Sequence, residues 1–267
     1  MVPRALTIAG SDSGGGAGIQ ADLKTMAAFQ VYGMSVLTAI TAQNTLGVQA
    51  AFELPLDLIA AQFDSVMSDL GCDAAKTGML SSPQVVELVC AKVREHGISR
   101  LVVDPVMIAK GGHPILAAEA VATVRRALLP LALVATPNLH EAERLAGVSI
   151  RTVADCREAA LRILDMGPKW VVVKGGHVEG PDAIDVATDG SQFIELVAPR
   201  IDTAHTHGTG CTFSAAIASC LAAGLDVPAA LDRAKRFVTE AIRTAPGLGA
   251  GHGPTNHCAG LASPWRQ

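Results

Sequence analysis

Runs of apolar and β-branched residues alternate along the chain with longer stretches in which apolar residues recur at helical spacing. The runs predict strands and the stretches predict helices, because side chains repeat about every 2 residues on a strand and about every 3.6 on a helix. The expected strands are 5–10, 35–42, 74–78, 101–104, 133–136 and 170–174. The expected helices are 19–29, 56–69, 83–95, 117–128, 140–145, 153–165, 212–223 and 228–244. This alternation is typical of a parallel sheet covered by crossover helices.

Segments 183–188 and 193–197 flank Asp189-Gly190. The dipeptide favours a tight turn, so these segments predict an antiparallel hairpin late in the chain. No repeat, low-complexity linker or block of charge divides the sequence. We therefore expect one domain over residues 1–267, an α/β fold with three layers (α/β/α) and a mainly parallel central sheet. A glycine-rich tail from about residue 247 is expected to be a surface loop.

Composition narrows the class of protein. The 267 residues are 49% hydrophobic and 3% aromatic, which suffices for one large core built from Ala, Val, Leu and Ile. A net charge of -4 provides no basic surface, so we expect no nucleic acid and no anionic membrane as partner. The longest apolar run, 128–135, is far shorter than the ~20 residues of a membrane helix, and the first residues do not resemble a signal peptide. The expectation is a soluble, cytoplasmic protein with a small-molecule ligand.

Glycine and polar residues gather where the predicted strands end. The exits contain Gly14, Gly15 and Gly16 after Asp12, and later Gln43, Asp104, Asn138 and Lys174. Because ligands of parallel sheets bind beyond the carboxyl ends of the strands, these residues predict a site for a polar ligand that carries phosphates. The glycine cluster matches neither the dinucleotide fingerprint nor the Walker pattern and is otherwise a flexible turn.

The turn His207-Gly208-Thr209-Gly210-Cys211 precedes a helix rich in small residues. Its backbone N–H groups at a helix start are suited to bind an anion. Cys211 is the one of six widely spaced cysteines for which we expect more than a buried apolar role, with a thiol pKa lowered by the helix end. The alternative is a glycine loop that caps a core helix beside an inert cysteine.

Two roles remain open for each of the other polar residues. Asp104, directly before Pro105, can hold a magnesium ion or start a turn. Asn138 and Glu141 can cap the next helix or reach a metal-bound phosphate. Lys174 follows a buried strand, where an ammonium group needs an anion beside it.

A series of short motifs follows in a fixed order. They are Ala9-Gly10-Ser11-Asp12, Gln20-Ala21-Asp22-Leu23-Lys24, Thr41-Ala42-Gln43-Asn44-Thr45, Lys76-Thr77-Gly78-Met79, Asp104-Pro105-Val106-Met107, Thr136-Pro137-Asn138, Lys174-Gly175-Gly176-His177 and His207-Gly208-Thr209-Gly210-Cys211-Thr212. Together they closely resemble the hydroxymethylpyrimidine/phosphomethylpyrimidine kinases of thiamine biosynthesis, from about residue 5 to residue 257. The resemblance implies a ribokinase-like fold that uses Mg²⁺ and ATP twice, on a hydroxymethyl group and then on the resulting monophosphate.

The resemblance also implies roles for single residues. The aminopyrimidine would be bound by Gln43, with Gly10, Asp22, Met79 and Val106 completing its pocket. Cys211 would accept the hydroxyl proton, and the N–H groups from Gly208 through Thr209 and Gly210 to Cys211 would hold the charge on the moving phosphoryl group. ATP phosphates would be bound by Lys174, Thr206 and Asn138, and Mg²⁺ or its waters by Asp104 and Glu141. Members of this family are often homodimers, which implies the same here.

The chain departs from the family at Ala109-Lys110-Gly111-Gly112-His113, where the family usually has Ala-Lys-Ser-Gly-Asp, and we assign no role to those positions. Two alternatives remain. A pyridoxal kinase would share the fold and the cysteine, although the carboxamide of Gln43 favours an aminopyrimidine. A binding module without catalysis is disfavoured by the combination of Cys211, Asp104 and Lys174.

Overall fold

The computed structural model describes residues 1–107, 118–176 and 180–261. In those ranges, nine strands form one sheet in the order β3-β2-β1-β4-β5-β6-β7-β8-β9. The strands are β1 (Arg4–Asp12), β2 (Tyr32–Asn44), β3 (Gly47–Glu53), β4 (Ala74–Thr77), β5 (Leu101–Val103), β6 (Val134–Ala135), β7 (Trp170–Val173), β8 (Asp182–Thr188) and β9 (Phe193–Pro199). The six strands from β2 to β7 in this order are parallel, and β3 and β8 are each antiparallel to their neighbours. The mainly parallel sheet and the late hairpin are confirmed.

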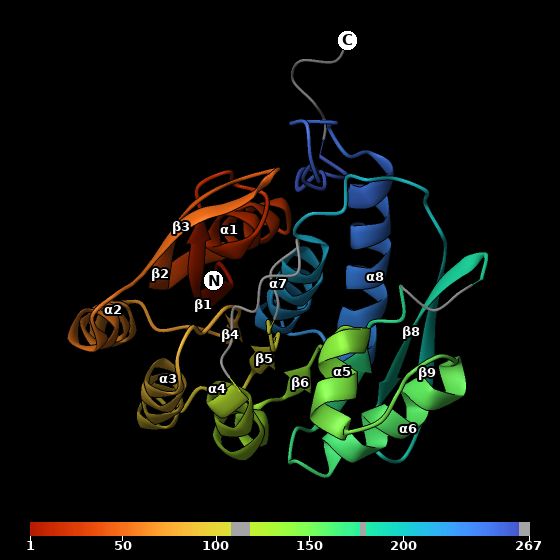
Figure 1. Cartoon of the computed structure of the whole chain (residues 1–267). Coiled ribbons are helices and arrows are strands. Elements are labelled where there is room, and N and C mark those ends of the chain that lie inside the picture. The colour runs from red at the N-terminus through yellow and green to blue at the C-terminus, as the bar shows by residue number, and fades with distance from the viewer. Residues whose placement is uncertain (108–117, 177–179, 262–267) are drawn as a thin grey trace.

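Helices cover both faces of the sheet (Figure 1). One layer consists of α1 (Gly18–Ala28), α7 (Thr209–Ala222) and α8 (Val227–Arg243). The opposite layer consists of α2 (Leu56–Asp69), α3 (Pro83–Glu95), α4 (Ala118–Thr123), α5 (Leu139–Ala146) and α6 (Val153–Leu164). After α4 the chain continues through a π-helical turn, η1 (Val124–Leu128), and a 3-10 turn, η2 (Leu129–Leu131). The three-layer α/β/α sandwich is confirmed.

Successive side chains of a strand point to opposite faces of the sheet, so the hydrophobic core has two parts, one on each face. In β5, Leu101 and Val103 pack with the layer of α2 to α6, whereas Val102 packs with α1, α7 and α8. In β7, Val171 likewise packs with the layer of α2 to α6, and Val172 packs with α1, α7 and α8. Each of these strands is buried on both faces, which is why their sequences are apolar at every position instead of alternating.

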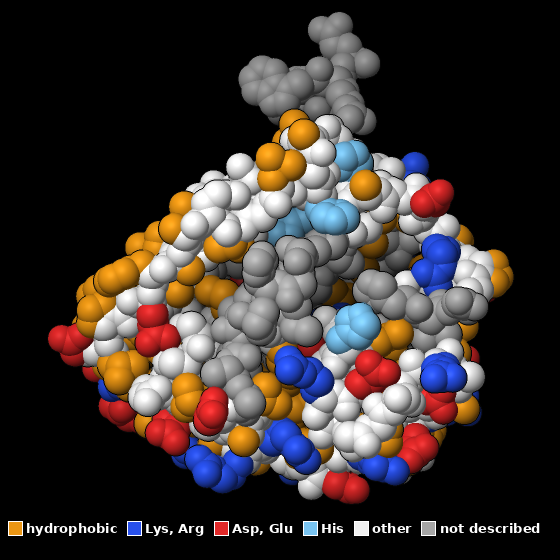
Figure 2. Space-filling view, viewed as in Figure 1, with side chains coloured by type: hydrophobic (Ala, Val, Ile, Leu, Met, Phe, Trp, Pro, Cys, Tyr) orange, Lys and Arg blue, Asp and Glu red, His pale blue; other side chains and the backbone are white. Residues whose placement is uncertain are grey.

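One strand was missed. β3 pairs antiparallel with the far end of β2, from Ala39 opposite Glu53 to Asn44 opposite Gly47. The hairpin extends beyond the covered part of the sheet and exposes Ile40 (47%), Leu46 (72%) and Phe52 (64%). Hydrophobic side chains gather along this side of the molecule (Figure 2). Because β3 has one β-branched residue and no buried face, its sequence lacks the alternation that predicts a strand.

Within the described ranges, none of the helices combines the length and the apolar character that crossing a membrane requires. The segment Ala109-Lys110-Gly111-Gly112-His113, where the sequence departs from the family pattern, lies outside the described residues.

Candidate active site

A cavity of about 800 Å³ opens at the carboxyl ends of the parallel strands. Every expected site residue but one lines it. These residues are Gly10, Gln43, Met79, Asp104, Val106, Asn138, Glu141, Lys174, Thr206, Gly208, Thr209, Gly210 and Cys211. Segments from both ends of the chain therefore meet in one site, as the rule on strand exits predicts.

Gly208 precedes α7 and has a φ of 78°, in the left-handed region that favours glycine. A Cβ atom at Gly208 would lie 1.8 Å from the backbone oxygen of Gly16, so a larger residue cannot fit. α7 begins at Thr209, three residues earlier than expected, which puts Cys211 in the first turn of the helix. The first N–H groups of a helix have no partner inside it, and the residues that carry them here, Thr209 to Cys211, line the cavity.

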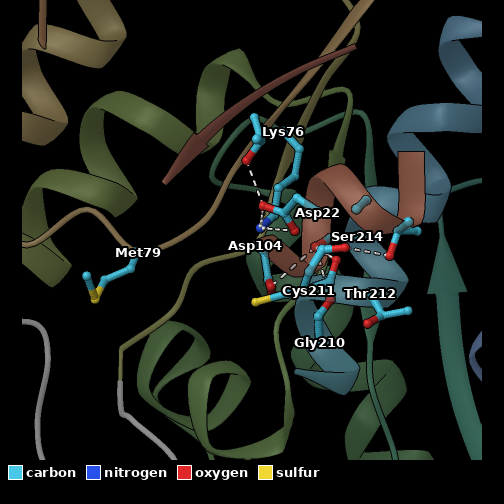
Figure 3. Close-up of polar contacts among 12 residues, drawn as sticks. Asp22, Lys76, Met79, Asp104, Gly210, Cys211, Thr212 and Ser214 are labelled. Carbon is cyan, nitrogen blue, oxygen red and sulfur yellow. Dashed lines mark hydrogen bonds and ion pairs between the residues drawn. The ribbon is translucent and has the colours of Figure 1, made fainter. Parts of the chain in front are cut away.

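Lys174 and Asp104 form an ion pair at the wall of this cavity, with 2.8 Å between Nζ and Oδ1. The hydroxyl of Ser214 in α7 lies 3.4 Å from the other carboxylate oxygen of Asp104 (Figure 3). Burial opposes the charge on Lys174, but Asp104 and Glu141 raise the pKa of its ammonium group above the usual value. A Cβ atom at Gly210 would lie 3.2 Å from Nζ of Lys174, so the glycine leaves room beside this cation.

Asn138 and Glu141 form a capping box at the start of α5. Oδ1 of Asn138 accepts from the N–H of Glu141 at 3.0 Å, and Oε2 of Glu141 accepts from the N–H of Asn138 at 2.7 Å. The helix-cap alternative is thus confirmed, although both residues also line the cavity. Burial raises the pKa of Glu141 to about 7, an effect that Lys174 reduces and Asp104 increases.

Asp104 and Glu141 provide a donor set for a hard cation. Both carboxylates interact with the ammonium group of Lys174, and the repulsion between them favours an added positive charge. Carboxylate oxygens are the ligands that Mg²⁺ prefers in proteins. The residues present therefore fit the expected magnesium ion.

The expectation of a lowered thiol pKa was wrong. Burial raises the pKa of Cys211 to about 11, and the nearby cation of Lys76 offsets only part of that rise. The helix end does not compensate for the loss of water around a thiolate, because desolvation disfavours the charged form. Cys211 is therefore a thiol at neutral pH in the protein without ligands.

Asp22, expected in the substrate pocket, is not among the described residues that line the cavity. It lies fully buried in α1, where Lys76 Nζ is 2.9 Å away and the hydroxyl of Thr7 donates to it at 2.6 Å (Figure 3). Burial raises the pKa of Asp22, although Lys76 and Thr7 lower it in part. The cavity is reached instead by Lys76, to which we had assigned no role. A lysine inside a short buried strand was the signal, since it needs a buried carboxylate as partner.

Asp12 and His207 join the two glycine turns and were also missed. The Asp12 carboxylate accepts from the backbone N–H groups of Gly14 (2.8 Å), Gly16 (3.2 Å) and Ala17 (2.8 Å), and from Nε2 of His207 (2.9 Å). Burial favours protonation of Asp12, but His207 and the backbone donors outweigh it and lower the pKa of the carboxyl. His207 in turn lies 3.3 Å from the side chain of Gln43.

Comparison with known proteins identifies the family. The model of the phosphomethylpyrimidine kinase family matches residues 12–256. A hydroxymethylpyrimidine/phosphomethylpyrimidine kinase of Streptomyces coelicolor is 54% identical over 255 residues, which are 96% of this chain and 94% of the relative.

Solved structures agree with this assignment. An ADP complex of pyridoxal kinase from Bacillus subtilis has a TM-score of 0.91 and 44% identity, with 97% of this chain and 98% of the other covered. A phosphomethylpyrimidine kinase from Clostridium difficile has a TM-score of 0.81 and 44% identity, with 90% and 99% covered. The fold is therefore ribokinase-like, and the chain belongs to the phosphomethylpyrimidine kinase family.

Proposed function

We propose that this chain phosphorylates 4-amino-5-hydroxymethyl-2-methylpyrimidine with ATP, first to the monophosphate and then to the diphosphate, in thiamine biosynthesis. The observation that carries the proposal is the meeting of Gln43, Lys174 and Cys211 in one cavity at the start of α7. Gln43 supplies a donor and an acceptor for an aminopyrimidine edge. Lys174 and the first N–H groups of α7 supply positive charge for phosphates.

In the first transfer, the hydroxyl oxygen forms a bond to the γ-phosphorus, the bond to the bridging oxygen breaks, and ADP leaves. We assign to Cys211 the acceptance of the hydroxyl proton. Only the thiolate can accept this proton; its raised pKa makes the thiolate scarce at neutral pH in the protein without ligands, and the cation of Lys76 favours its formation. Lys174 and the N–H groups of Gly208 to Cys211 stabilise the charge on the moving group.

Thr206 and Asn138, which line the same cavity, are proposed to contact ATP phosphates with Lys174. Asp104 and Glu141 would hold Mg²⁺ or its waters. When bound, the ion would neutralise charge on the phosphate oxygens and orient them. Gly10, Met79 and Val106 are proposed to contact the pyrimidine ring, whereas Asp22 acts through Lys76.

The test is a side-by-side assay with Mg²⁺ and ATP of hydroxymethylpyrimidine, its monophosphate and pyridoxal. ADP formation with both pyrimidines supports the proposal. Pyridoxal kinase is the second candidate, because the Bacillus subtilis enzyme of that name is 44% identical in sequence with a TM-score of 0.91. A kcat/KM for pyridoxal above that for hydroxymethylpyrimidine would reverse the assignment, and no ADP with any substrate would indicate a binding module.

We further propose that residues 1–267 act as one catalytic domain in the cytoplasm and that the protein is a homodimer. The exposed apolar residues of the β2–β3 hairpin, Ile40, Leu46 and Phe52, support an interface between copies at this edge. Light scattering of the native chain and of Phe52→Asp tests this. A dimeric wild type and a monomeric variant are expected, and a monomeric wild type would contradict the proposal.

A further inference from the structure

The hydrogen-bonding state of His207 follows from its neighbour. Nε2 of His207 lies 2.9 Å from Oδ2 of Asp12, and the two side chains are 13% and 4% exposed. A carboxylate can only accept hydrogen bonds, so Nε2 must carry a hydrogen and donate it to Asp12. The same nitrogen lies 3.3 Å from the atom placed as the amide nitrogen Nε2 of Gln43. An N–H group of Gln43 cannot point at that N–H of His207, so the amide oxygen must face the histidine.

Thr41 leads independently to the same orientation. Its hydroxyl lies 2.8 Å from the backbone oxygen of Ser11, which can only accept, so the hydroxyl proton is directed there. The same Oγ1 lies 3.2 Å from the atom placed as Oε1 of Gln43, and with its proton already directed to Ser11 it can only accept there, which requires the amide nitrogen at that position. Both contacts therefore require the two terminal atoms of Gln43 to be exchanged, with the amide nitrogen toward Thr41 and the oxygen toward His207.

We propose that His207, held by Asp12, and Thr41 are positioning residues that hold the carboxamide of Gln43 in one orientation for the aminopyrimidine edge. With the amide oxygen facing the N–H that His207 shares between Asp12 and Gln43, and the amide nitrogen donating to Thr41, the oxygen keeps one acceptor position and the nitrogen one donor position for a ligand. This inference rests on the proposed function, because it concerns how Gln43 recognises that substrate.

The fixed order of donor and acceptor determines specificity. An aminopyrimidine presents an amino donor beside a ring-nitrogen acceptor, which matches an amide in one orientation and opposes it in the other. A pyridine ring without the amino group offers no such pair. A site built to pair both groups of a substrate discriminates strongly against analogues that lack one of them, because its own polar groups are then left unpaired.

The first experiment compares His207→Leu with wild type in the native chain. We expect the Kd and KM for hydroxymethylpyrimidine to rise roughly tenfold to hundredfold, with the KM for ATP and kcat changed less than about threefold. His252→Leu is the matched control, because His252 is an exposed histidine that contacts the backbone of Ala204. A pyrimidine KM within twofold of wild type in His207→Leu would overturn the proposal.

A double-mutant cycle separates positioning from a general structural effect. In a Gln43→Ala background, His207→Leu should change pyrimidine binding by less than about twofold, because the residue through which it acts is gone. Additive losses would show that His207 does not act through Gln43. Thr41→Val should weaken pyrimidine binding and Thr41→Ser should restore it, and equal effects of the two would contradict the role of the hydroxyl.

Failure of this inference differs from failure of the proposed function. A wild-type chain that phosphorylates hydroxymethylpyrimidine, with variants that bind it normally, rejects only the positioning role. A wild-type chain that neither binds nor phosphorylates the pyrimidine rejects the function and, with it, the inference.

Discussion

Two lysine–aspartate pairs beside the cavity have the same chemistry and different surroundings. Lys174 and Asp104 are 2.8 Å apart, with side chains 14% and 3% exposed. Lys76 and Asp22 are 2.9 Å apart, and both side chains are fully buried. Both lysines interact electrostatically with Cys211. Both lysines line the cavity, but the pairs differ in exposure to water and in geometry, because Lys76 contacts both oxygens of Asp22 and Lys174 contacts one oxygen of Asp104.

This difference suggests that one lysine binds the ligand and the other stabilises the protein around the site. Lys174 faces a space that a phosphate can enter, so it can exchange part of its contact with Asp104 for the ligand. Lys76 cannot leave Asp22 without exposing a carboxylate to an apolar interior, which is costly. We infer that the first pair serves the reaction directly and the second maintains a fixed positive charge beneath Cys211.

The largest expected effect is on stability. Lys76→Met should lower the free energy of unfolding by about 3–5 kcal/mol, because it leaves the buried Asp22 carboxylate without its cation. The double variant Lys76→Met with Asp22→Leu should regain most of that loss. Urea denaturation measures both. Equal stability of Lys76→Met and wild type would mean that the fully buried pair is not more important for stability than the pair of Lys174 and Asp104.

Cys211→Ala removes the group that both lysines face. Turnover in the first phosphorylation should fall at least ~10²-fold, the usual scale for a missing general base, with substrate affinity retained. The monophosphate is an internal control. Its acceptor is a phosphate oxygen that is largely ionised near neutral pH, since its second pKa is about 6, so the second transfer should fall far less. Equal losses in the two transfers, measured as initial rates of ADP formation, would argue against a base role for Cys211.

Lys174→Met tests the pair that faces the cavity. We expect a loss of about tenfold in kcat/KM for ATP, the effect of one charge-assisted contact of ~1.4 kcal/mol, with a smaller loss of stability than in Lys76→Met. Thr136 and Ser214 remain as neutral donors to Asp104 in this variant. Steady-state kinetics and urea denaturation check it together, and the opposite ranking of the two variants in stability would reverse the comparison.

The smallest effect is a shift in the pH dependence of Cys211 alkylation. Since the thiolate is the reactive form and the pKa of Cys211 is about 11, alkylation should still be rising at pH 10. Removal of a cation destabilises the thiolate, so Lys76→Met should move the profile to still higher pH. Peptide mass spectrometry after alkylation resolves Cys211 from exposed Cys258. An unchanged profile would show that Lys76 does not act on the thiol.

The sequence predicts elements that bury a face and misses those that do not. Strands such as 101–104 and 170–174 are apolar because both of their faces are covered, and their predicted positions agree with β5 and β7 to within one residue. β3 has no buried face, so its sequence does not need to alternate between apolar and polar residues. The start of α7 was placed three residues late, because the glycines that open it have low helix propensity.

Strand exits predict which residues meet but not which of them pair. Thirteen of the fourteen expected site residues line the cavity, because the ends of parallel strands meet at one edge. The contact of Asp12 with His207 joins positions 195 residues apart, and no local pattern encodes it. The pKa of Cys211 was misjudged for a related reason. A helix start is visible in the sequence, whereas the burial that outweighs it depends on the whole fold.

The close approach of Gly208 to Gly16 has a consequence for biosynthesis. The first glycine turn leaves the ribosome almost two hundred residues before its partner turn, and N-terminal segments of a chain generally begin to fold first. Asp12 therefore cannot form its hydrogen bond with His207 until the final quarter of the chain has been synthesised. Any truncated product of translation that ends before α7 lacks both the thiol and the contact that unites the two turns, so catalytic competence is acquired only with near-complete synthesis.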